Sequence, residues 1–148
     1  MISSILIPTD FSPASWSAAQ FGLEISRLND EAIISFLHVF PVSAKYAYTN
    51  ELISHDSKIK EVEDRMNQLA QNLLDRAEEK IRNVVLSGNV ENTTLRFIKE
   101  HQFDLVIVGI NSNGRNNELG SHTVSVIKES GVPVMIVPNR SENGAIAS

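Results

Sequence analysis

The chain has 148 residues, of which 42% are hydrophobic and 21% charged, and 13 Lys and Arg against 18 Asp and Glu give a formal net charge of −5. These values are typical of one globular domain and argue against a disordered, collagen-like or disulfide-stapled chain. The absence of cysteine excludes structural disulfides and thiolate-bound zinc. No stretch concentrates Lys and Arg densely enough to neutralise the run of phosphates along a nucleic-acid strand, so nucleic acid is not expected as a partner. No apolar run approaches the roughly 18 residues of a membrane span, so we expect no membrane partner and a cytoplasmic location.

The first part of the chain predicts a parallel β-α-β unit. Residues 2–8 form a short apolar run that ends at a proline, which is typical of a strand buried on both faces. Ser12 followed by Pro13 predicts a helix start, because a serine hydroxyl accepts from free N–H groups and proline suits the first turn. Apolar residues then recur at helical steps to about residue 28. Residues 32–40 predict a second buried strand.

The middle of the chain predicts a connection followed by a long helix. Residues 42–51 show no period and are expected to be mobile. Over residues 52–83, apolar side chains recur at steps of three and four, with charged residues on the other face. A coiled coil is the alternative, but the repeat lasts only about three heptads and strands flank it, which favours a helix lying on a sheet. The apolar positions are Ile59, Val62, Met66, Leu69, Leu73, Ala77 and Ile81.

The next segment alternates strand and helix again. Residues 84–87 predict a short third strand, and residues 92–101 predict a brief helix. Residues 104–109 form a continuous apolar run and predict a buried fourth strand. A loop rich in glycine and asparagine follows over residues 109–119.

The end of the chain predicts one more helix and strand. Residues 120–130 are expected to be helical, and Gly131 suits the left-handed conformation that ends a helix. Residues 132–137 predict the fifth strand, in which Pro133 has no N–H for a ladder hydrogen bond and so favours an edge position. Residues 139–148 are small and polar and predict a disordered tail.

The order of these elements predicts an α/β fold with a five-stranded parallel sheet and helices on both faces. With the first strand central, as is common in doubly wound folds, the strand order is 3-2-1-4-5 and the fourth strand lies beside the first. Ligands of such sheets bind outside the carboxyl ends of the strands, where the strand order reverses. The expected crevice therefore lies between residues 8–12 and residues 109–120.

The loop after the fourth strand has features that suit an anion. Gly109, Gly114 and Gly120 allow backbone N–H groups to approach a ligand closely. Gly120 and Ser121 open a helix, whose N–H groups and dipole attract phosphate, and Arg115 adds a cation. The alternative is a solvated turn before an ordinary helix cap, and spacing alone does not separate the two.

Other sequence motifs for catalysis or ligand binding are weak. The loop nearly matches the Walker A motif, but Arg115 replaces its lysine and Asn116 its magnesium-binding hydroxyl, which excludes a P-loop NTPase. Asp10 either contacts a ligand or caps the following helix together with Ser12, and capping is the more common role. No G-x-S-x-G or His-Glu-x-x-His motif occurs, so no catalytic residue or metal ligand is assigned. His122 is the one histidine placed near the expected phosphate position.

The chain resembles the universal stress protein domain at the ends of its strands. The matching motifs are Pro-x-Asp-x-Ser, His-Val, Asp-Leu-Val-Ile-Val-Gly, Gly-Ser and Pro-Val-x-x-Val-Pro. They lie, in that order, at residues 8–12, 38–39, 104–109, 120–121 and 133–138. The resemblance covers residues 2–138. It implies one universal stress protein domain over residues 1–138, with a Rossmann-like fold of the adenine nucleotide α-hydrolase type.

The resemblance also implies a stress-response module that binds an adenine nucleotide. Members of the family either bind ATP, which implies Mg²⁺ as its companion ion, or bind no nucleotide. The binders carry G-x2-G-x9-G-[ST] after the fourth strand, whereas this loop is shorter and places Ser112 at the second glycine. A nucleotide-free interaction protein of the same fold therefore stays the alternative, and slow ATP hydrolysis is a weaker one without an identifiable general base. The candidate ligand contacts are Pro8, Thr9, Asp10, Val39, Gly109, Ser112, Gly114, Arg115, Gly120, Ser121 and His122.

The family likeness further implies a homodimer. In it the fifth strands of two subunits pair antiparallel, which would cover an apolar edge strand. The residues expected at this contact are Val132, Val134 and Ile136.

Overall fold

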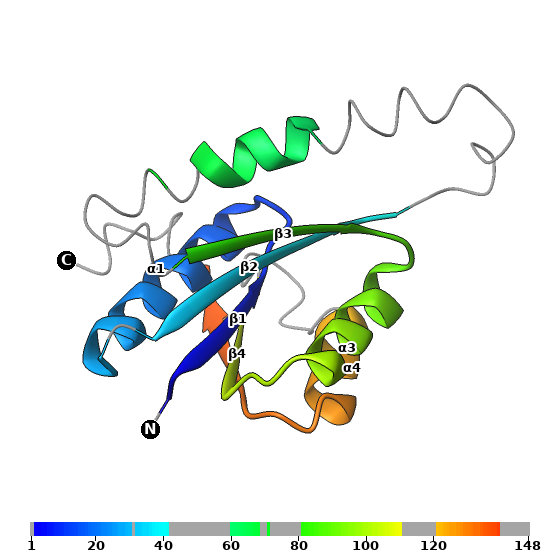
Figure 1. Cartoon of the computed structure of the whole chain (residues 1–148). Helices are drawn as coiled ribbons and strands as arrows, with labels where there is room; N and C mark the ends of the chain where they lie inside the picture. The colour runs from blue at the N-terminus through cyan, green and yellow to red at the C-terminus, as the bar shows by residue number, and fades with distance from the viewer. Residues whose placement is uncertain are drawn as a thin grey trace, which may run out of the picture.

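The computed structural model describes residues 2–30, 32–41, 60–68, 71, 81–110 and 121–139, and of residues 121–124 the backbone alone. These residues form a five-stranded parallel sheet of order β3-β2-β1-β4-β5 with helices on both faces (Figure 1). The α/β class and the strand order predicted from the sequence are confirmed.

Each predicted strand has a counterpart. The strands are β1 (Ser4–Pro8), β2 (Ile33–Phe40), β3 (Ile81–Ser87), β4 (Leu105–Ile110) and β5 (Val134–Pro138). The helices are α1 (Pro13–Leu28), α3 (Val90–Glu100) and α4 (Ser121–Glu129), and residues 60–68 are also helical.

The central strand β1 explains why the sheet needs a core on both faces. Ile5, Leu6 and Ile7 are all 0% exposed, and successive residues of a strand point to opposite faces. Pairing with β2 and β4 places Ile5 beside Ile34 on one side and Leu105 on the other. The unbroken apolar run that indicated a buried strand therefore reflects helices on both sides.

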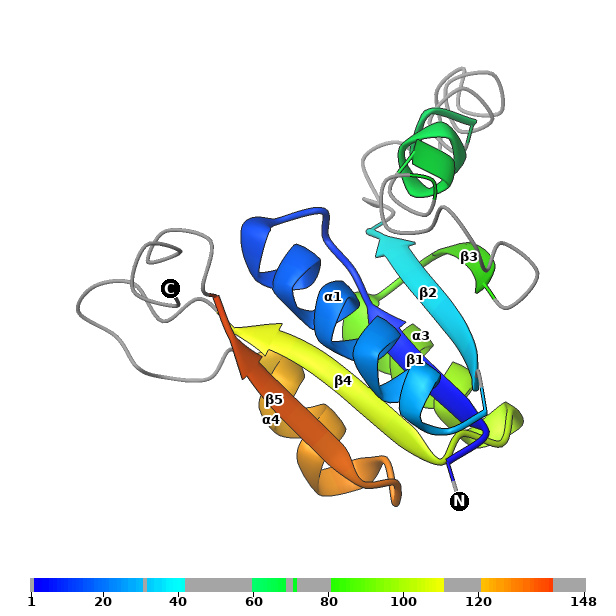
Figure 2. The same ribbon diagram turned by 90° about the vertical axis from the view of Figure 1, so that its left-hand side faces the viewer.

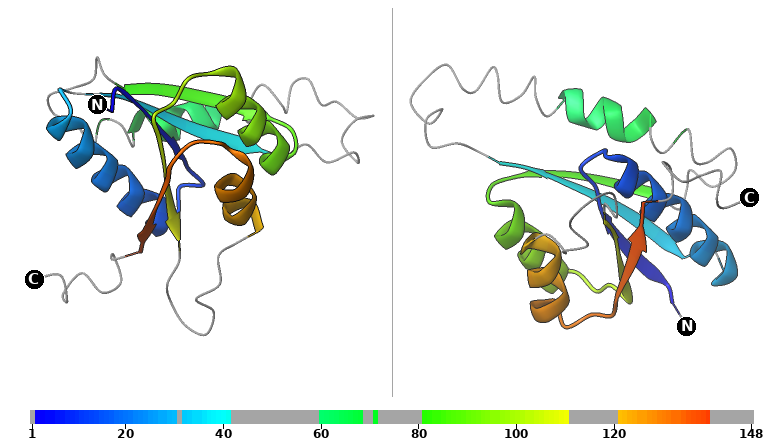
Figure 3. Two further views of the ribbon diagram at one scale, coloured as in Figure 1. Left: turned by 90° about the horizontal axis from the view of Figure 1, so that it is seen from below. Right: turned by 180° about the vertical axis from the view of Figure 1, so that it is seen from behind.

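Two helical layers cover the sheet, as Figures 2 and 3 show. The helix α1 and the helical residues 60–68 cover one face, and α3 and α4 cover the other (Figure 3). The first core includes Ile5, Ile7, Ala18, Phe36, Met66 and Ile107. The second core includes Leu6, Leu37, Leu95, Ile98, Val106 and Val126.

The long helix predicted over residues 52–83 is confirmed in part. Among its described residues, Val62 and Met66 are 2% and 0% exposed and pack in the first core, so this segment lies on the sheet as expected. The prediction is wrong for residues 81–83, which belong to β3. The prediction failed because Ile81 happens to fall on the helical period. In addition, Arg82 and Asn83 are both exposed on an edge strand, so the residues do not show the alternation of apolar and polar side chains that indicates a strand. Pairing with β2 decides its conformation.

The fifth strand begins later than predicted. β5 starts at Val134, because Ser130 and Val132 form a turn in which the Ser130 hydroxyl and the Val132 backbone are hydrogen-bonded. Gly131 has φ of 71°, the left-handed conformation expected after the helix. β5 lies at the edge of the sheet, which confirms the position inferred from Pro133.

Some expectations fall outside the described residues. These are the connection at 42–51, most of the loop at 109–119 and the tail from residue 140 onward. Asn139, the first residue of the predicted tail of residues 139–148, is described, and its N–H donates to the Ile110 carbonyl at 2.9 Å. Within the described part of the chain, no helix has the length and apolar character to cross a membrane.

Candidate functional site

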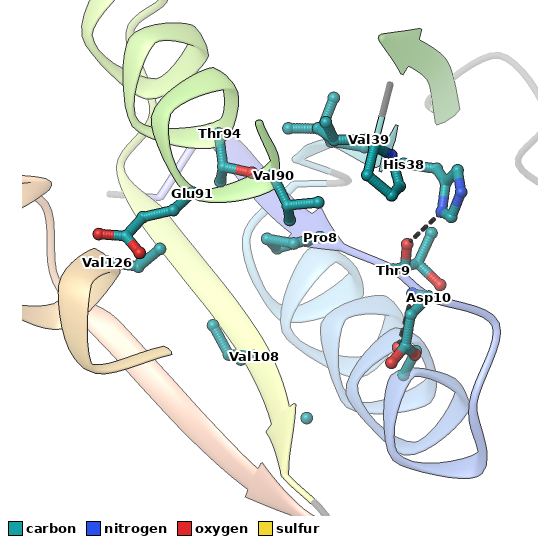
Figure 4. A pocket seen from close by; sticks show the side chains of 14 residues that line it. Pro8, Thr9, Asp10, His38, Val39, Val90, Glu91, Thr94, Val108 and Val126 are labelled. Atoms are coloured by element: carbon teal, nitrogen blue, oxygen red, sulfur yellow. Dashed lines mark hydrogen bonds between the residues drawn. The ribbon is translucent and has the colours of Figure 1, made fainter. Parts of the chain in front are cut away.

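A cavity of about 430 Å³ opens at the carboxyl edge of the sheet (Figure 4). It lies where β1 and β4 are neighbours, which is the point where the strand order reverses. Its volume falls within the range of about 300–1,000 Å³ that is usual for small-molecule sites. The lining residues are Pro8, Thr9, Asp10, Ser15, Leu37, His38, Val39, Pro41, Val90, Glu91, Thr94, Val108, Gly109 and Val126.

The walls of the cavity are mostly apolar. Figure 4 shows Pro8 and Val39, from β1 and β2, facing the space between the sheet and the first turn of α3. Val108 of β4 and Val126 of α4 close the opposite side. Such walls suit a flat, weakly polar group, with the polar groups at the rim setting its orientation.

Gly109 is needed for close packing as well as for the cavity. A Cβ at this position would overlap the backbone carbonyl of Ala14 in the first turn of α1. The end of β4 therefore approaches the start of α1 more closely than any side chain allows. The sequence indicated Gly109 only as a ligand contact, because nothing local to it points to Ala14.

The turn between β1 and α1 is built around Asp10. Its Oδ1 accepts hydrogen bonds from Ser15 Oγ at 2.7 Å and from the Ser12 N–H at 2.9 Å. Ser12 caps α1, and its Oγ accepts from the Ser15 N–H at 3.2 Å. Asp10 thus holds the turn that precedes the helix, which favours the capping role over a purely ligand-binding one.

The Asp10 carboxyl is ionised at neutral pH. Its partial burial favours the neutral form, but the hydrogen bonds from Ser12 and Ser15 outweigh burial and lower the pKa of Asp10 below its ordinary value. Asp10 therefore presents a fixed negative charge and hydrogen-bond acceptors at the rim of the cavity.

A ring cluster beside the same turn was not predicted. His38 Nδ1 lies 2.8 Å from the Thr9 carbonyl oxygen, and because a carbonyl only accepts, Nδ1 carries the proton. Phe11 has φ of 65° and its ring centroid lies 4.9 Å from that of His38. The Arg65 guanidinium lies 4.3 Å from the Phe11 ring centroid. No sequence pattern links Arg65 to Phe11, since the contact joins segments on different elements.

Glu91 is a second carboxylate of the cavity that sequence reasoning missed. It lies in the first turn of α3, and its Oε1 accepts from Ser125 Oγ of α4 at 2.6 Å. Thr94, three residues further along the same helix, is 5% exposed and also lines the cavity. The acidic first turn after the third strand was the available indication, because that end of the helix faces the carboxyl edge of the sheet.

The structure brings together part of the predicted site. Pro8, Thr9, Asp10, Val39 and Gly109 all line the cavity. The predicted contacts Ser112, Gly114, Arg115 and Gly120 lie outside the described residues, and Ser121 and His122 are described by their backbone alone, at the start of α4. Over the described ranges, no three His, Cys, Asp or Glu side chains are grouped as a metal site requires.

The doubly wound parallel sheet, with a cavity at its switch point, makes this a Rossmann-like α/β protein. The sequence model of the universal stress protein family matches residues 1–138. The chain therefore belongs to the universal stress protein family, and the resemblance stated from its strand ends is confirmed.

Individual relatives agree with this assignment over nearly their whole length. The universal stress protein MJ0577 of Methanocaldococcus jannaschii is 27% identical over an alignment of 161 positions, which covers 95% of this chain and 98% of that protein. The solved structure of universal stress protein UspA from Lactobacillus plantarum has a TM-score of 0.73 at 23% identity, covering 92% of this chain and 97% of that one. A family member from Arabidopsis thaliana, solved with AMP bound, has a TM-score of 0.60 at 18% identity, and the match covers 95% of this chain and 94% of that one.

Proposed function

We propose that the protein is a cytoplasmic stress-response module that binds an adenine nucleotide in the cavity between β1 and β4. The observation that carries the proposal is that residues from separate strands meet at one cavity. Pro8, Asp10, Val39 and Gly109, which the family resemblance assigns to the nucleotide, come from three separate strand ends and line one cavity. A protein of the same fold holds AMP, which supports this ligand class.

The cavity fits the parts of a nucleotide. Pro8, Val39 and Val108 offer an apolar slot for the base. The Asp10 carboxylate accepts hydrogen bonds from an amino group or from ribose hydroxyls. α4 begins at Ser121 after the loop that follows β4, so its free N–H groups and positive dipole end favour a phosphate at the carboxyl edge.

Calorimetric titration of the full chain with ATP and AMP, each with and without Mg²⁺, tests the proposal. The test variant Val108→Phe fills the cavity from its β4 wall and is expected to weaken binding at least about tenfold, which corresponds to about 1.4 kcal/mol. The control is Val84→Phe, because Val84 is also half-buried and packs on the second core but does not line the cavity. Absence of binding to either nucleotide at millimolar concentration would reject the proposal.

One observation favours a second function, a dimeric interaction protein of the same fold. Ile136 is a large apolar side chain, 36% exposed, on the edge strand β5. An exposed apolar edge strand needs a cover, and antiparallel pairing with β5 of a second copy would supply one. Sedimentation equilibrium of the full chain without nucleotide tests this, because a monomer at all concentrations would exclude the dimer.

A further inference from the structure

We propose that the Thr94 hydroxyl is a specificity contact of the cavity and hydrogen-bonds a polar atom on the edge of the bound base. The inference rests on the proposed nucleotide-binding function and names the side chain that recognises the base in that same site. It depends on one juxtaposition, a buried hydroxyl with no partner among the described residues on the apolar wall of a cavity of ligand size.

Thr94 is buried although its hydroxyl has no protein partner. The residue lies in the second turn of α3 and is 5% exposed. In the part of the chain that the structure describes, no group is hydrogen-bonded to its Oγ1. Other hydroxyls of the cavity lining are paired. Thr9 Oγ1 accepts from the Phe11 N–H at 3.1 Å, and Ser15 Oγ donates to the Asp10 carboxylate at 2.7 Å.

An unpaired hydroxyl in apolar surroundings costs free energy, because it has given up its hydrogen bonds to water. Most buried polar groups in proteins therefore have a partner, and one without a partner needs an explanation. The cavity wall around Thr94 is apolar. Val90 lies one helical turn before it, and Leu37 and Val39 belong to β2, on which α3 packs. A ligand that fills this end of the cavity gives the hydroxyl the partner that these side chains do not offer.

The position of Thr94 indicates the base of a nucleotide and not its ribose. Figure 4 shows Thr94 on α3 and the Asp10 carboxylate at the β1–α1 turn, with Pro8 between them. Asp10 lies at the exposed rim, which suits ribose hydroxyls, whereas Thr94 is buried beside the apolar slot proposed for the base. A hydroxyl both donates and accepts, so it suits a ring nitrogen or an exocyclic amino group on the base edge.

This contact makes the cavity select a base with a polar atom at that point. A wall that hydrogen-bonds a ligand atom rejects an analogue that lacks the atom, because the polar group of the wall is then buried without a partner. An apolar wall does not make this distinction. Thr94 therefore turns a slot for any flat aromatic group into one that favours a nitrogen-containing base.

A structural role for the hydroxyl is the competing explanation, because threonine side chains in helices can bond to a carbonyl of the preceding turn. Thr94→Val separates the two roles, since valine keeps the shape of threonine and replaces the hydroxyl with a methyl group. Thr94→Ser keeps the hydroxyl and is the rescue variant. Thr93→Val is the matched control, because Thr93 is the preceding residue of α3, is only partly buried and does not line the cavity.

The experiment measures the melting temperatures of the four full-length proteins without ligand and their affinities for AMP. It includes AMP analogues in which carbon replaces one ring nitrogen of the base, and purine riboside monophosphate, which lacks the amino group. Thr94→Val should weaken AMP binding about threefold to tenfold, as expected for one neutral hydrogen bond, without lowering the melting temperature. Thr93→Val should bind AMP as the wild type does, and Thr94→Ser should bind it more tightly than Thr94→Val. The analogue that lacks the paired atom should bind the wild type and Thr94→Val equally.

The outcomes separate this inference from the function on which it rests. If AMP binds none of the proteins, the proposed function fails and the inference with it. If AMP binds the wild type and Thr94→Val equally, the inference alone is wrong. A fall of more than about 2 °C in the melting temperature of Thr94→Val also overturns it, since the hydroxyl then has a partner in the free protein. Equal weakening of AMP and every analogue does so too, because no single base atom then pairs with Thr94.

Discussion

Removal of the Asp10 carboxylate tests whether the β1–α1 turn is held as described. Asp10→Ala loses the hydrogen bonds from Ser15 Oγ at 2.7 Å and from the Ser12 N–H at 2.9 Å. Hydrogen bonds to a charged group contribute about 1.5–3 kcal/mol when buried, and partial exposure at the rim reduces this. We expect a loss of about 1–2 kcal/mol in the free energy of unfolding, or about 2–8 °C in Tm for a domain of this size. Asp10→Asn keeps an acceptor oxygen and should lose about half as much.

The stability that the Asp10 carboxylate contributes is also expected to depend on pH. Because the folded protein lowers the pKa of Asp10 below its ordinary value of 3.8, the unfolded chain binds more protons in that window. The contribution of the carboxylate is therefore fully present above the unfolded pKa and is lost as pH falls through the folded pKa. The stability difference between wild type and Asp10→Asn should be constant near neutral pH and shrink towards zero in acid.

Urea denaturation between neutral and acid pH measures this difference, followed through the fluorescence of Trp16, the single tryptophan, which lies in α1 beside the turn. The control variant Glu24→Gln changes an exposed acid on the same helix and should leave stability unaltered. A difference between wild type and Asp10→Asn that persists undiminished at low pH would refute the argument that the ionised carboxylate stabilises the turn.

Two further predictions concern packing. Gly109→Ala should destabilise the protein by at least about 2 kcal/mol, because its Cβ would overlap the Ala14 carbonyl, which belongs to rigid backbone; an unchanged urea midpoint would show that β4 and α1 have room to separate. Met66→Ala should cost about 2–5 kcal/mol, since Met66 is 0% exposed in the first core. The exposed neighbour Glu63→Ala is its control, and equal effects of the two substitutions in urea denaturation would contradict the packing of residues 60–68 on the sheet.

Much of the fold could be predicted because local patterns record burial directly. The continuous apolar runs of β1 and β4 indicated strands covered on both faces, and Ile5, Leu6 and Val106 are all fully buried. Ser12 and Pro13 indicated the start of α1, because the Ser12 hydroxyl accepts from the Ser15 N–H and proline suits the first position, both within one turn of the helix. Part of the site followed from topology, since the carboxyl ends of β1 and β4 meet at the switch point.

The sequence by itself determined the class of fold, because its alternating strand and helix periods require right-handed β-α-β connections. The strand order and the edge of the sheet that carries the cavity followed once the first strand was taken as central, as is common in doubly wound folds. Only the tertiary structure decided that residues 81–83 join β3, that Gly109 packs on Ala14, and that Glu91 reaches Ser125. These outcomes depend on partners far along the chain. Glu91 and Ser125 are 34 residues apart, and no local pattern records which distant groups come into contact when two helices pack on the same face of a sheet.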